Sequence, residues 1–117
     1  MPHALVVEDD EGLRGFLAAL LVHHGLDVLS AGSGEEALEL LGDRALALAV
    51  LDVGLPGMSG FDVADRLGKT PVIIVTGDPV GAYAKAYTRP GLDYRVLPKP
   101  VSPEVFEHAL DEVLAPV

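Results

Sequence analysis

Two apolar runs in the sequence end in acidic residues at the point where each run stops. The run 47–51 ends in Asp52, and the run 4–7 ends in the acidic segment 8–10. Uninterrupted apolar runs of this length are typical of parallel strands that are buried on both faces, so each acid is expected at the carboxyl end of a strand. Ligands of open α/β sheets bind at this end. The two runs therefore predict a crevice in which several carboxylates meet.

Two further apolar runs add a hydroxyl and an ammonium group to the same edge. The run 72–75 ends on Thr76, and the run 94–97 is followed by Lys99. Carboxylates that share a crevice repel one another, and a hard cation relieves this repulsion; Mg²⁺ fits best, because it accepts carboxylates, a backbone carbonyl and a phosphate oxygen as ligands. A metal, an ammonium and a hydroxyl around a carboxylate nucleophile supply the electrostatics that phosphoryl transfer needs.

The elements that must position these side chains alternate between strand and helix. The expected strands are 4–7, 27–31, 47–51, 72–75 and 94–97, and the expected helices are 11–24, the segment between Ser33 and Gly42, a short helix near 61–67, 80–89 and 103–114. Ser33 with Glu36 has the form of a capping box, and Ser102 before Pro103 has the form of a helix start. Five strand–helix repeats imply right-handed crossovers and an α/β fold, a doubly wound five-stranded parallel sheet with helices on both faces.

The composition limits the class of function. A chain of 117 residues is expected to form one domain, and the absence of cysteine excludes disulfides and thiol chemistry. The formal net charge of -10 argues against nucleic acid as a direct partner. No apolar run approaches the length of about 20 residues that a membrane span needs. The short start Met1-Pro2-His3 leads straight into a strand without a signal peptide, so the protein is expected to be cytoplasmic.

The acids, the hydroxyl and the lysine occur in an order that resembles a known family. The motifs that carry the resemblance are Val6-Val7-Glu8-Asp9-Asp10, Leu51-Asp52 with Leu55-Pro56-Gly57-Met58-Ser59-Gly60, Thr76-Gly77 and Lys99-Pro100. Over residues 4–115 the chain resembles a response-regulator receiver domain, the phosphoacceptor module of two-component signalling. The resemblance implies a flavodoxin-like (βα)5 sheet with strand order 2-1-3-4-5, which places the ends of the first and third strands at the topological switch point.

By this resemblance, Asp52 accepts a phosphoryl group from a histidine kinase or a phosphotransfer protein. Asp9 and Asp52 would bind Mg²⁺ (or Mn²⁺) directly, and Gly54 would give its backbone carbonyl to the metal. Glu8 would act on the metal through water. Asp10 lies one position beyond the family's usual acidic pair and is expected to be a surface acid or one that acts indirectly.

The resemblance also gives roles to the ends of the last two strands. Lys99 would pair with Asp52 before phosphorylation and with the phosphate after it, while Thr76 would turn inward to bond a phosphate oxygen. The change would be read on the face of the fourth helix, fifth strand and last helix, by a downstream effector protein or in a homodimer. The domain would be a signalling module rather than an enzyme, with at most self-phosphorylation from small donors and self-dephosphorylation. The Lys99-Pro100 bond resembles the family's cis peptide.

The chain departs from the family pattern in three places. Val96 lies three residues before Lys99, where many members have a switch aromatic, so we expect a weaker switch. The segment between Asp52 and Thr76 is short, which should clip the third helix. No output domain follows in the sequence, so the single domain 1–117 is expected to be either a stand-alone regulator or a fragment of a larger protein.

Other classes of function fit these residues less well. A metal-dependent aspartyl-nucleophile phosphatase, of the haloacid-dehalogenase type, would need a general acid two residues after the nucleophile, and here that residue is Gly54. A flavodoxin-like cofactor binder would need a phosphate loop after the first strand, where this chain is acidic. A degenerate receiver that acts only by protein contacts stays open. Tyr83 and Tyr87, four residues apart, are expected to pack on one helix face.

Overall fold

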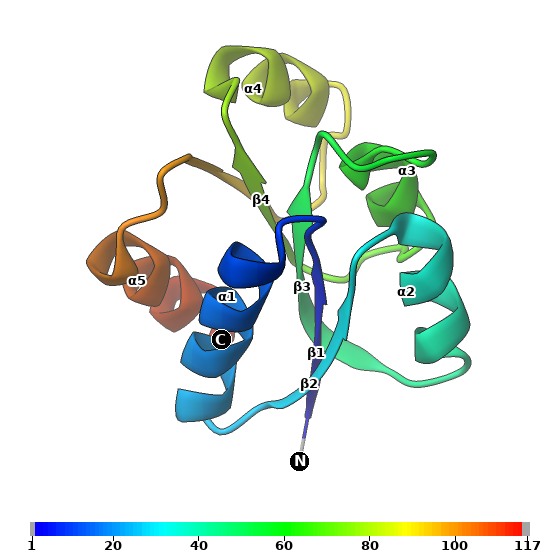
Figure 1. Ribbon diagram of the computed structural model, residues 1–117. Coiled ribbons are helices and arrows are strands. Elements are labelled where there is room, and N and C mark those ends of the chain that lie inside the picture. The colour runs from blue at the N-terminus through cyan, green and yellow to red at the C-terminus, as the bar shows by residue number, and fades with distance from the viewer. Residues whose placement is uncertain (1, 116–117) are drawn as a thin grey trace.

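Five parallel strands form one sheet in the order β2-β1-β3-β4-β5 (Figure 1). The computed structural model describes residues 2–115. Its elements are β1 (His3–Val7), α1 (Glu11–His23), β2 (Asp27–Ala31), α2 (Gly34–Leu41), β3 (Leu46–Asp52), α3 (Gly60–Asp65), β4 (Val72–Thr76), α4 (Pro79–Tyr87), β5 (Tyr94–Pro98) and α5 (Pro103–Leu114). The predicted doubly wound (βα)5 fold and its strand order are confirmed, and the predicted element bounds are close to these.

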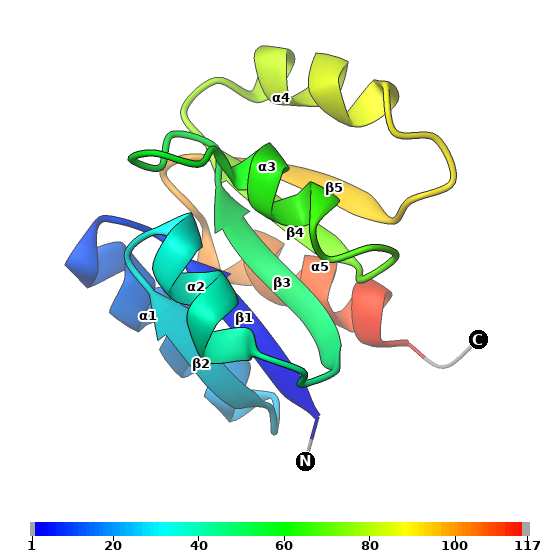
Figure 2. The same ribbon diagram turned by 90° about the vertical axis from the view of Figure 1, so that its right-hand side faces the viewer.

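The strands divide their side chains between two separate cores. Leu5 and Val7 of β1 belong to the core under α2, α3 and α4, whereas Ala4 and Val6 belong to the core under α1 and α5. Figures 1 and 2 show α1 and α5 on one face of the sheet, with α2 and α3 on the other. Because the inner strands are covered on both faces, both sets of alternating side chains must be apolar. This double burial explains the continuous apolar runs in the sequence.

Polar side chains fix the start of every helix. The N-cap residues are Asp10, Ser33, Ser59, Asp78 and Ser102, and each side chain accepts a hydrogen bond from a backbone N–H in the first turn. The caps predicted at Ser33 and Ser102 are confirmed. Ser33 accepts from Glu36 N, and the reciprocal box with both hydrogen bonds occurs instead at Ser59 and Asp62.

The prediction that Tyr83 and Tyr87 pack on one helix face is wrong. Their exposed fractions are 59% and 89%, and Ala82 is the residue of α4 that is buried. A residue as small as alanine lets the helix lie close to β4 and β5, and it leaves no inward position for the tyrosine rings. Tyr83 keeps one contact with the sheet, because its hydroxyl donates to the carbonyl of Val96 at 3.4 Å.

The third helix is short, as its segment length predicts, and spans only 6 residues.

Among residues 2–115, no helix combines the length and the apolar character needed to cross a membrane.

Candidate functional site

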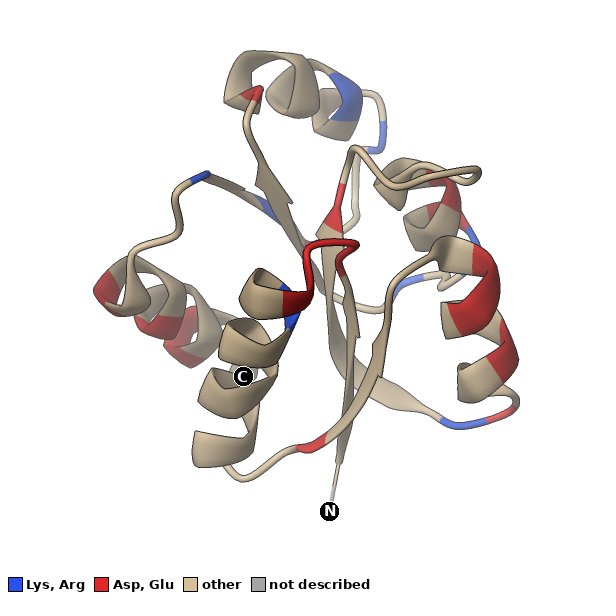
Figure 3. Cartoon of the chain, in the orientation of Figure 1, with Lys and Arg blue, Asp and Glu red and all other residues tan. Residues whose placement is uncertain are grey.

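The predicted acids meet at the carboxyl edge of the sheet. β1 and β3 are paired neighbours, with Val7 opposite Leu51, so the residues that follow each of them emerge together. Ligand oxygens of Glu8, Asp9 and Asp52 all lie within 4.8 Å of one another. Figure 3 shows this edge, where the red loop after β1 lies beside the red end of β3. The topological switch point thus holds three carboxylates in one place.

Glu8 is the most enclosed of the three acids, with an exposed fraction of 1%. Its Oε2 accepts from Asp10 N at 3.1 Å, and its backbone carbonyl accepts from Arg14 Nη1 at 3.0 Å. Its Oε1 lies 2.9 Å from Lys99 Nζ, as an ion pair whose angles do not make a hydrogen bond. Burial raises the pKa of Glu8 to about 7, even though the Lys99 ammonium and the Asp10 amide lower it.

Lys99 joins two of the carboxylates. Its Nζ lies 2.9 Å from Glu8 Oε1 and 3.2 Å from Asp52 Oδ2. Partial burial lowers the pKa of Lys99, but electrostatic attraction to the carboxylates of Glu8 and Asp52 outweighs this effect, so the pKa is raised and the ammonium keeps its charge. The backbone holds this side chain in place, since Lys99 N donates to Thr76 O at 2.8 Å. The Lys99-Pro100 peptide bond is cis, as the resemblance implies.

Asp52 ends β3 with an exposed fraction of 7%. Its Oδ1 accepts from the backbone N–H of Gly54 at 3.2 Å, while its Oδ2 pairs with Lys99. The loop folds back tightly beyond this point: a Cβ atom on Gly60 would lie 2.2 Å from the carbonyl oxygen of Asp52, so only glycine fits there. The backbone N–H of Gly54 thus orients Oδ1 of Asp52, and the ammonium of Lys99 orients Oδ2.

Thr76 ends β4, and its exposed fraction is 4%. Its Oγ1 accepts from the backbone N–H of Asp78 at 2.9 Å. The hydroxyl is thus engaged by the loop that leads into α4, and Asp78 in turn caps α4 by accepting from Gly81 N at 3.1 Å. The residue at this strand end links the carboxyl edge of the sheet to a helix.

Some of these relations were not predicted from the sequence. Lys99 was expected to pair with Asp52, and the structure places it against Glu8 as well. Asp10 was expected at the surface, where it lies, but it also caps α1 by accepting from Leu13 N at 3.0 Å. The cap had a signal in the sequence, because an acid directly before an amphipathic helix is a common N-cap. No sequence pattern indicated the hydrogen bond from Arg14 to the backbone carbonyl of Glu8.

Comparison with known proteins identifies the family. The sequence model of the family described as "Response regulator receiver domain" matches residues 4–111. The chain belongs to the response-regulator receiver domain family. This match covers all the elements that carry the site, from β1 into α5.

Relatives and solved structures agree with this assignment. The chain is 37% identical over 117 residues to the transcriptional regulatory protein AfsQ1 of Streptomyces coelicolor, covering 97% of this chain and 52% of AfsQ1. It therefore spans about half the length of that curated relative. The non-phosphorylated HemR receiver domain of Leptospira biflexa superposes with a TM-score of 0.84 at 30% identity, covering 100% of this chain and 97% of that one. The chemotaxis protein CheY4 of Vibrio cholerae superposes with a TM-score of 0.82 at 26% identity, covering 97% and 99%.

The receiver family binds Mg²⁺ at an acidic cluster, and the residues of this chain suit that ion. Glu8, Asp9 and Asp52 offer oxygen ligands within 4.8 Å of one another, which are the donors that a hard divalent cation prefers. Asp9 is exposed, so the cluster is open to solvent on one side. Three carboxylates faced by one ammonium also leave net negative charge, which a divalent cation would neutralise.

Proposed function

We propose that this receiver domain accepts a phosphoryl group on Asp52 from a histidine kinase or a phosphotransfer protein. The observation that carries the proposal is the position of Lys99, whose ammonium contacts Asp52 and Glu8 at the same time. A cation in this place orients the Asp52 carboxylate. It can also stabilise the negative charge that develops on a transferred phosphoryl group. Receiver domains act as signalling modules in two-component systems, and this role needs no enzymatic turnover.

The chemistry of transfer follows from the contacts of Asp52. A carboxylate oxygen of Asp52 attacks the phosphorus of a phosphohistidine; the new P–O bond forms as the P–N bond breaks, and the imidazole nitrogen keeps the electron pair. Lys99 stays beside the oxygens that gain charge. Bound Mg²⁺ would neutralise charge on the phosphoryl oxygens. Asp9 and Asp52 would hold the ion directly, Gly54 through its carbonyl and Glu8 through water.

Thr76 would report the transfer to the rest of the domain. Its hydroxyl now accepts from Asp78 N, and donation to a phosphate oxygen would draw it toward Asp52. The face formed by α4, β5 and α5 is where we expect an effector protein, or a second copy of the domain, to read the change. A groove of about 300 Å³ on this face supports that expectation, and Tyr83, Val96 and Val105 are among its lining residues.

Labelling with acetyl phosphate tests the proposal. In the presence of Mg²⁺ the wild-type chain should gain one phosphoryl group, and Asp52→Asn should gain none. Asp62→Asn, which changes an exposed acid in α3, is the control and should label like the wild type. Full labelling of Asp52→Asn would refute the assignment. Beryllofluoride binding seen by NMR distinguishes a working receiver from a degenerate one that acts only by protein contacts.

A further inference from the structure

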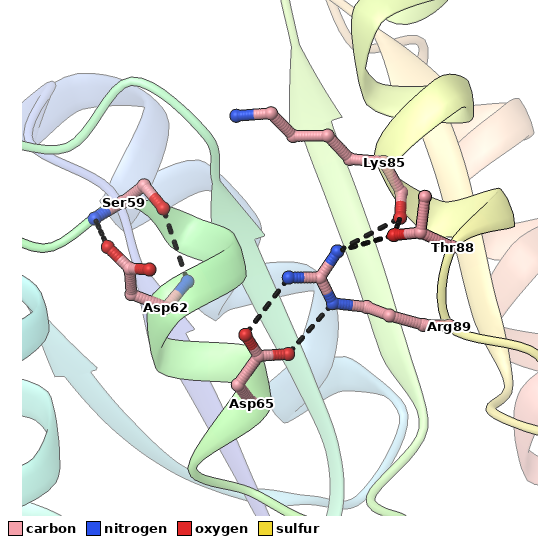
Figure 4. A network of polar contacts seen from close by, with 6 residues as sticks. All are labelled: Ser59, Asp62, Asp65, Lys85, Thr88 and Arg89. Carbon is pink, nitrogen blue, oxygen red and sulfur yellow. Dashed lines mark hydrogen bonds and ion pairs between the residues drawn. The ribbon is translucent and has the colours of Figure 1, made fainter.

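An arginine two residues after the end of α4 links this helix to α3. Arg89 Nε lies 2.8 Å from Asp65 Oδ1, and Arg89 Nη2 lies 2.9 Å from Asp65 Oδ2. This two-pronged contact joins residues that are 24 positions apart in the chain, and Figure 4 shows the guanidinium facing the carboxylate across the space between the helices. The pair lowers the pKa of Asp65 and raises that of Arg89, mainly through the hydrogen bonds between them.

The same guanidinium also closes the C-terminal end of α4. Its Nη1 donates to the carbonyl of Lys85 at 2.9 Å and to Thr88 Oγ1 at 3.3 Å. Its Cζ lies 4.8 Å from the centre of the Phe61 ring, in the arrangement of a cation–π contact. Phe61 is buried in α3, and its ring centre lies 6.3 Å from that of Tyr94 on β5. Arg89 therefore fastens the end of α4 to a helix and, through Phe61, to a strand.

The opposite end of α4 is held by a different residue. Asp78, the N-cap, donates its backbone N–H to the Thr76 hydroxyl at 2.9 Å. Between the two ends α4 packs lightly, because Ala82 is its buried residue while Tyr83 and Tyr87 are exposed. One anchor of α4 thus lies at the candidate phosphorylation site. The other is the side chain of Arg89, whose hydrogen bonds within residues 2–115 go only to Asp65, Lys85 and Thr88.

We propose that Arg89 is the pivot of α4 and that the helix swings about this residue when Asp52 is phosphorylated. The proposal rests on the function proposed above. When the Thr76 hydroxyl leaves Asp78 for a phosphate oxygen, α4 loses its N-terminal anchor, while the bonds of Arg89 involve no atom of the site and persist. The displacement of α4 should then be largest near Asp78 and smallest near Tyr87.

A pivot is a contact that is present in both the resting and the active state, whereas a lock is a contact that stabilises only the resting state. The two alternatives predict different effects of removing Arg89. A contact that exists equally in both states cannot shift the equilibrium between them, because a shift requires a difference in interaction free energy. Loss of the pivot should therefore leave the affinity for beryllofluoride within about twofold of wild type. The C-terminal end of α4 should then move together with its N-terminal end. Loss of a lock would make the active state easier to reach and would raise that affinity by the whole energy of the pair.

The first experiment uses the unliganded chain. Arg89→Gln and Asp65→Asn each remove the two-pronged pair, so each should speed hydrogen exchange of amides 84–89 by about threefold to tenfold. The double variant should add little to either single change. Arg95→Gln is the matched control: Arg95 is also partly buried and pairs with Asp93 and Glu112 on the other side of β5, so it should leave exchange in 84–89 unchanged. Unchanged exchange in both single variants would overturn the pivot.

The second experiment adds Mg²⁺ and beryllofluoride and follows amide shifts along α4. In the wild type and in Arg95→Gln, shifts should decrease from residue 78 to residue 87. In Arg89→Gln they should spread to residues 85–92 at nearly unchanged affinity. An affinity that rises tenfold would overturn the pivot in favour of a lock. A wild-type chain that binds no beryllofluoride would refute the proposed function, and with it the swing, while the exchange result would still measure how Arg89 holds α4.

Discussion

Lys99 Nζ lies 2.9 Å from Glu8 Oε1, at a point where the side chain of Glu8 is only 1% exposed. The ammonium has a second partner in Asp52, so the positive charge at this edge is shared between two acids. Glu8 thus receives only part of the compensation that a buried carboxylate needs. Burial therefore raises the pKa of Glu8 by more than Lys99 lowers it.

The first prediction concerns the pH dependence of stability in the absence of metal. The pKa of Glu8 is raised from 4.5 to about 7, so the proton favours the folded state. The stabilisation by this proton is fully present below about pH 4.5 and is lost as the pH rises through about 7. Glu8→Gln keeps a neutral side chain at every pH, so its melting temperature should exceed that of the wild type more at about pH 8 than at about pH 5.

Thermal unfolding with a chelator present checks this prediction. Glu39→Gln removes an exposed acid of α2 and should show no such pH-dependent difference. A constant difference between Glu8→Gln and wild type across the range would mean that Glu8 is ionised throughout.

The second prediction separates two neighbouring acids. Asp9 offers an oxygen to the carboxylate cluster, so Asp9→Ala should weaken Mg²⁺ binding strongly. Asp10 caps α1, so Asp10→Ala should lower the free energy of unfolding by about 1 kcal/mol and change Mg²⁺ affinity much less. Titration calorimetry and urea unfolding measure the two quantities. Equal losses of Mg²⁺ affinity in both variants would show that the metal ligand is misassigned.

The third prediction is that Lys99 acts oppositely on metal binding and on transfer. Lys99→Met removes the cation that competes with Mg²⁺ for Glu8 and Asp52, so the affinity for Mg²⁺ should rise severalfold. The same change removes a charge that supports the transferring group, so phosphorylation by acetyl phosphate should slow by about 100-fold. Lys69→Met, in the exposed segment before β4, should alter neither. Weaker Mg²⁺ binding in Lys99→Met would contradict this view of the site.

The fourth prediction concerns the loop after β3. At Gly60 a methyl group would meet the main chain of Asp52 at 2.2 Å, so Gly60→Ala should cost about 1–3 kcal/mol of stability. At Gly54 an added Cβ would find nothing within 4 Å and the backbone needs no positive φ, so Gly54→Ala should be tolerated. Denaturant unfolding compares the two. A Gly60→Ala chain as stable as Gly54→Ala would mean that the loop can move away from Asp52.

The fifth prediction concerns how far activation spreads. Val96 is a small side chain that is already buried, with an exposed fraction of 6%. It therefore cannot undergo the outward-to-inward movement of an aromatic ring. Beryllofluoride should therefore shift the amides of the segment 76–92 by reordering the loop and α4, with the largest shifts near Asp78 and the smallest near Tyr87. Thr76→Val should reduce these shifts, whereas Thr88→Val, at the far end of α4, should preserve those near Asp78. Changes confined to α1 and α2, with residues 76–101 silent, would contradict the prediction.

The sequence was sufficient for the fold and for the core of the site because both depend on strands buried on two faces. Continuous apolar runs locate β1 and β3, and parallel neighbours bring the residues after them together, so the meeting of Glu8 and Asp52 could be predicted. The run 94–97 placed Lys99 at the same edge, and the resemblance to receiver domains added support for the strand order and the pairing of Lys99 with Asp52.

The contacts that were missed depend on side-chain directions that periodicity does not encode. Asp65 ends α3 and Arg89 lies two residues after α4, 24 positions further along the chain, and no local pattern pairs them. The exposure of Tyr83 and Tyr87 was also missed, because spacing of four residues identifies a shared helix face without saying whether that face is turned inward.

The outward position of these two rings has a practical consequence. The chain has no tryptophan and three tyrosines, and all three lie between positions 83 and 94, on α4 and β5. Its tyrosine emission therefore originates entirely from this region, without any engineered label. Tyr94 is partly buried against Phe61, while the other two tyrosines are exposed, so quenching by a small solute such as acrylamide would distinguish the emission of the two environments. The native chain thus carries an optical probe on α4, the helix for which we propose a swing.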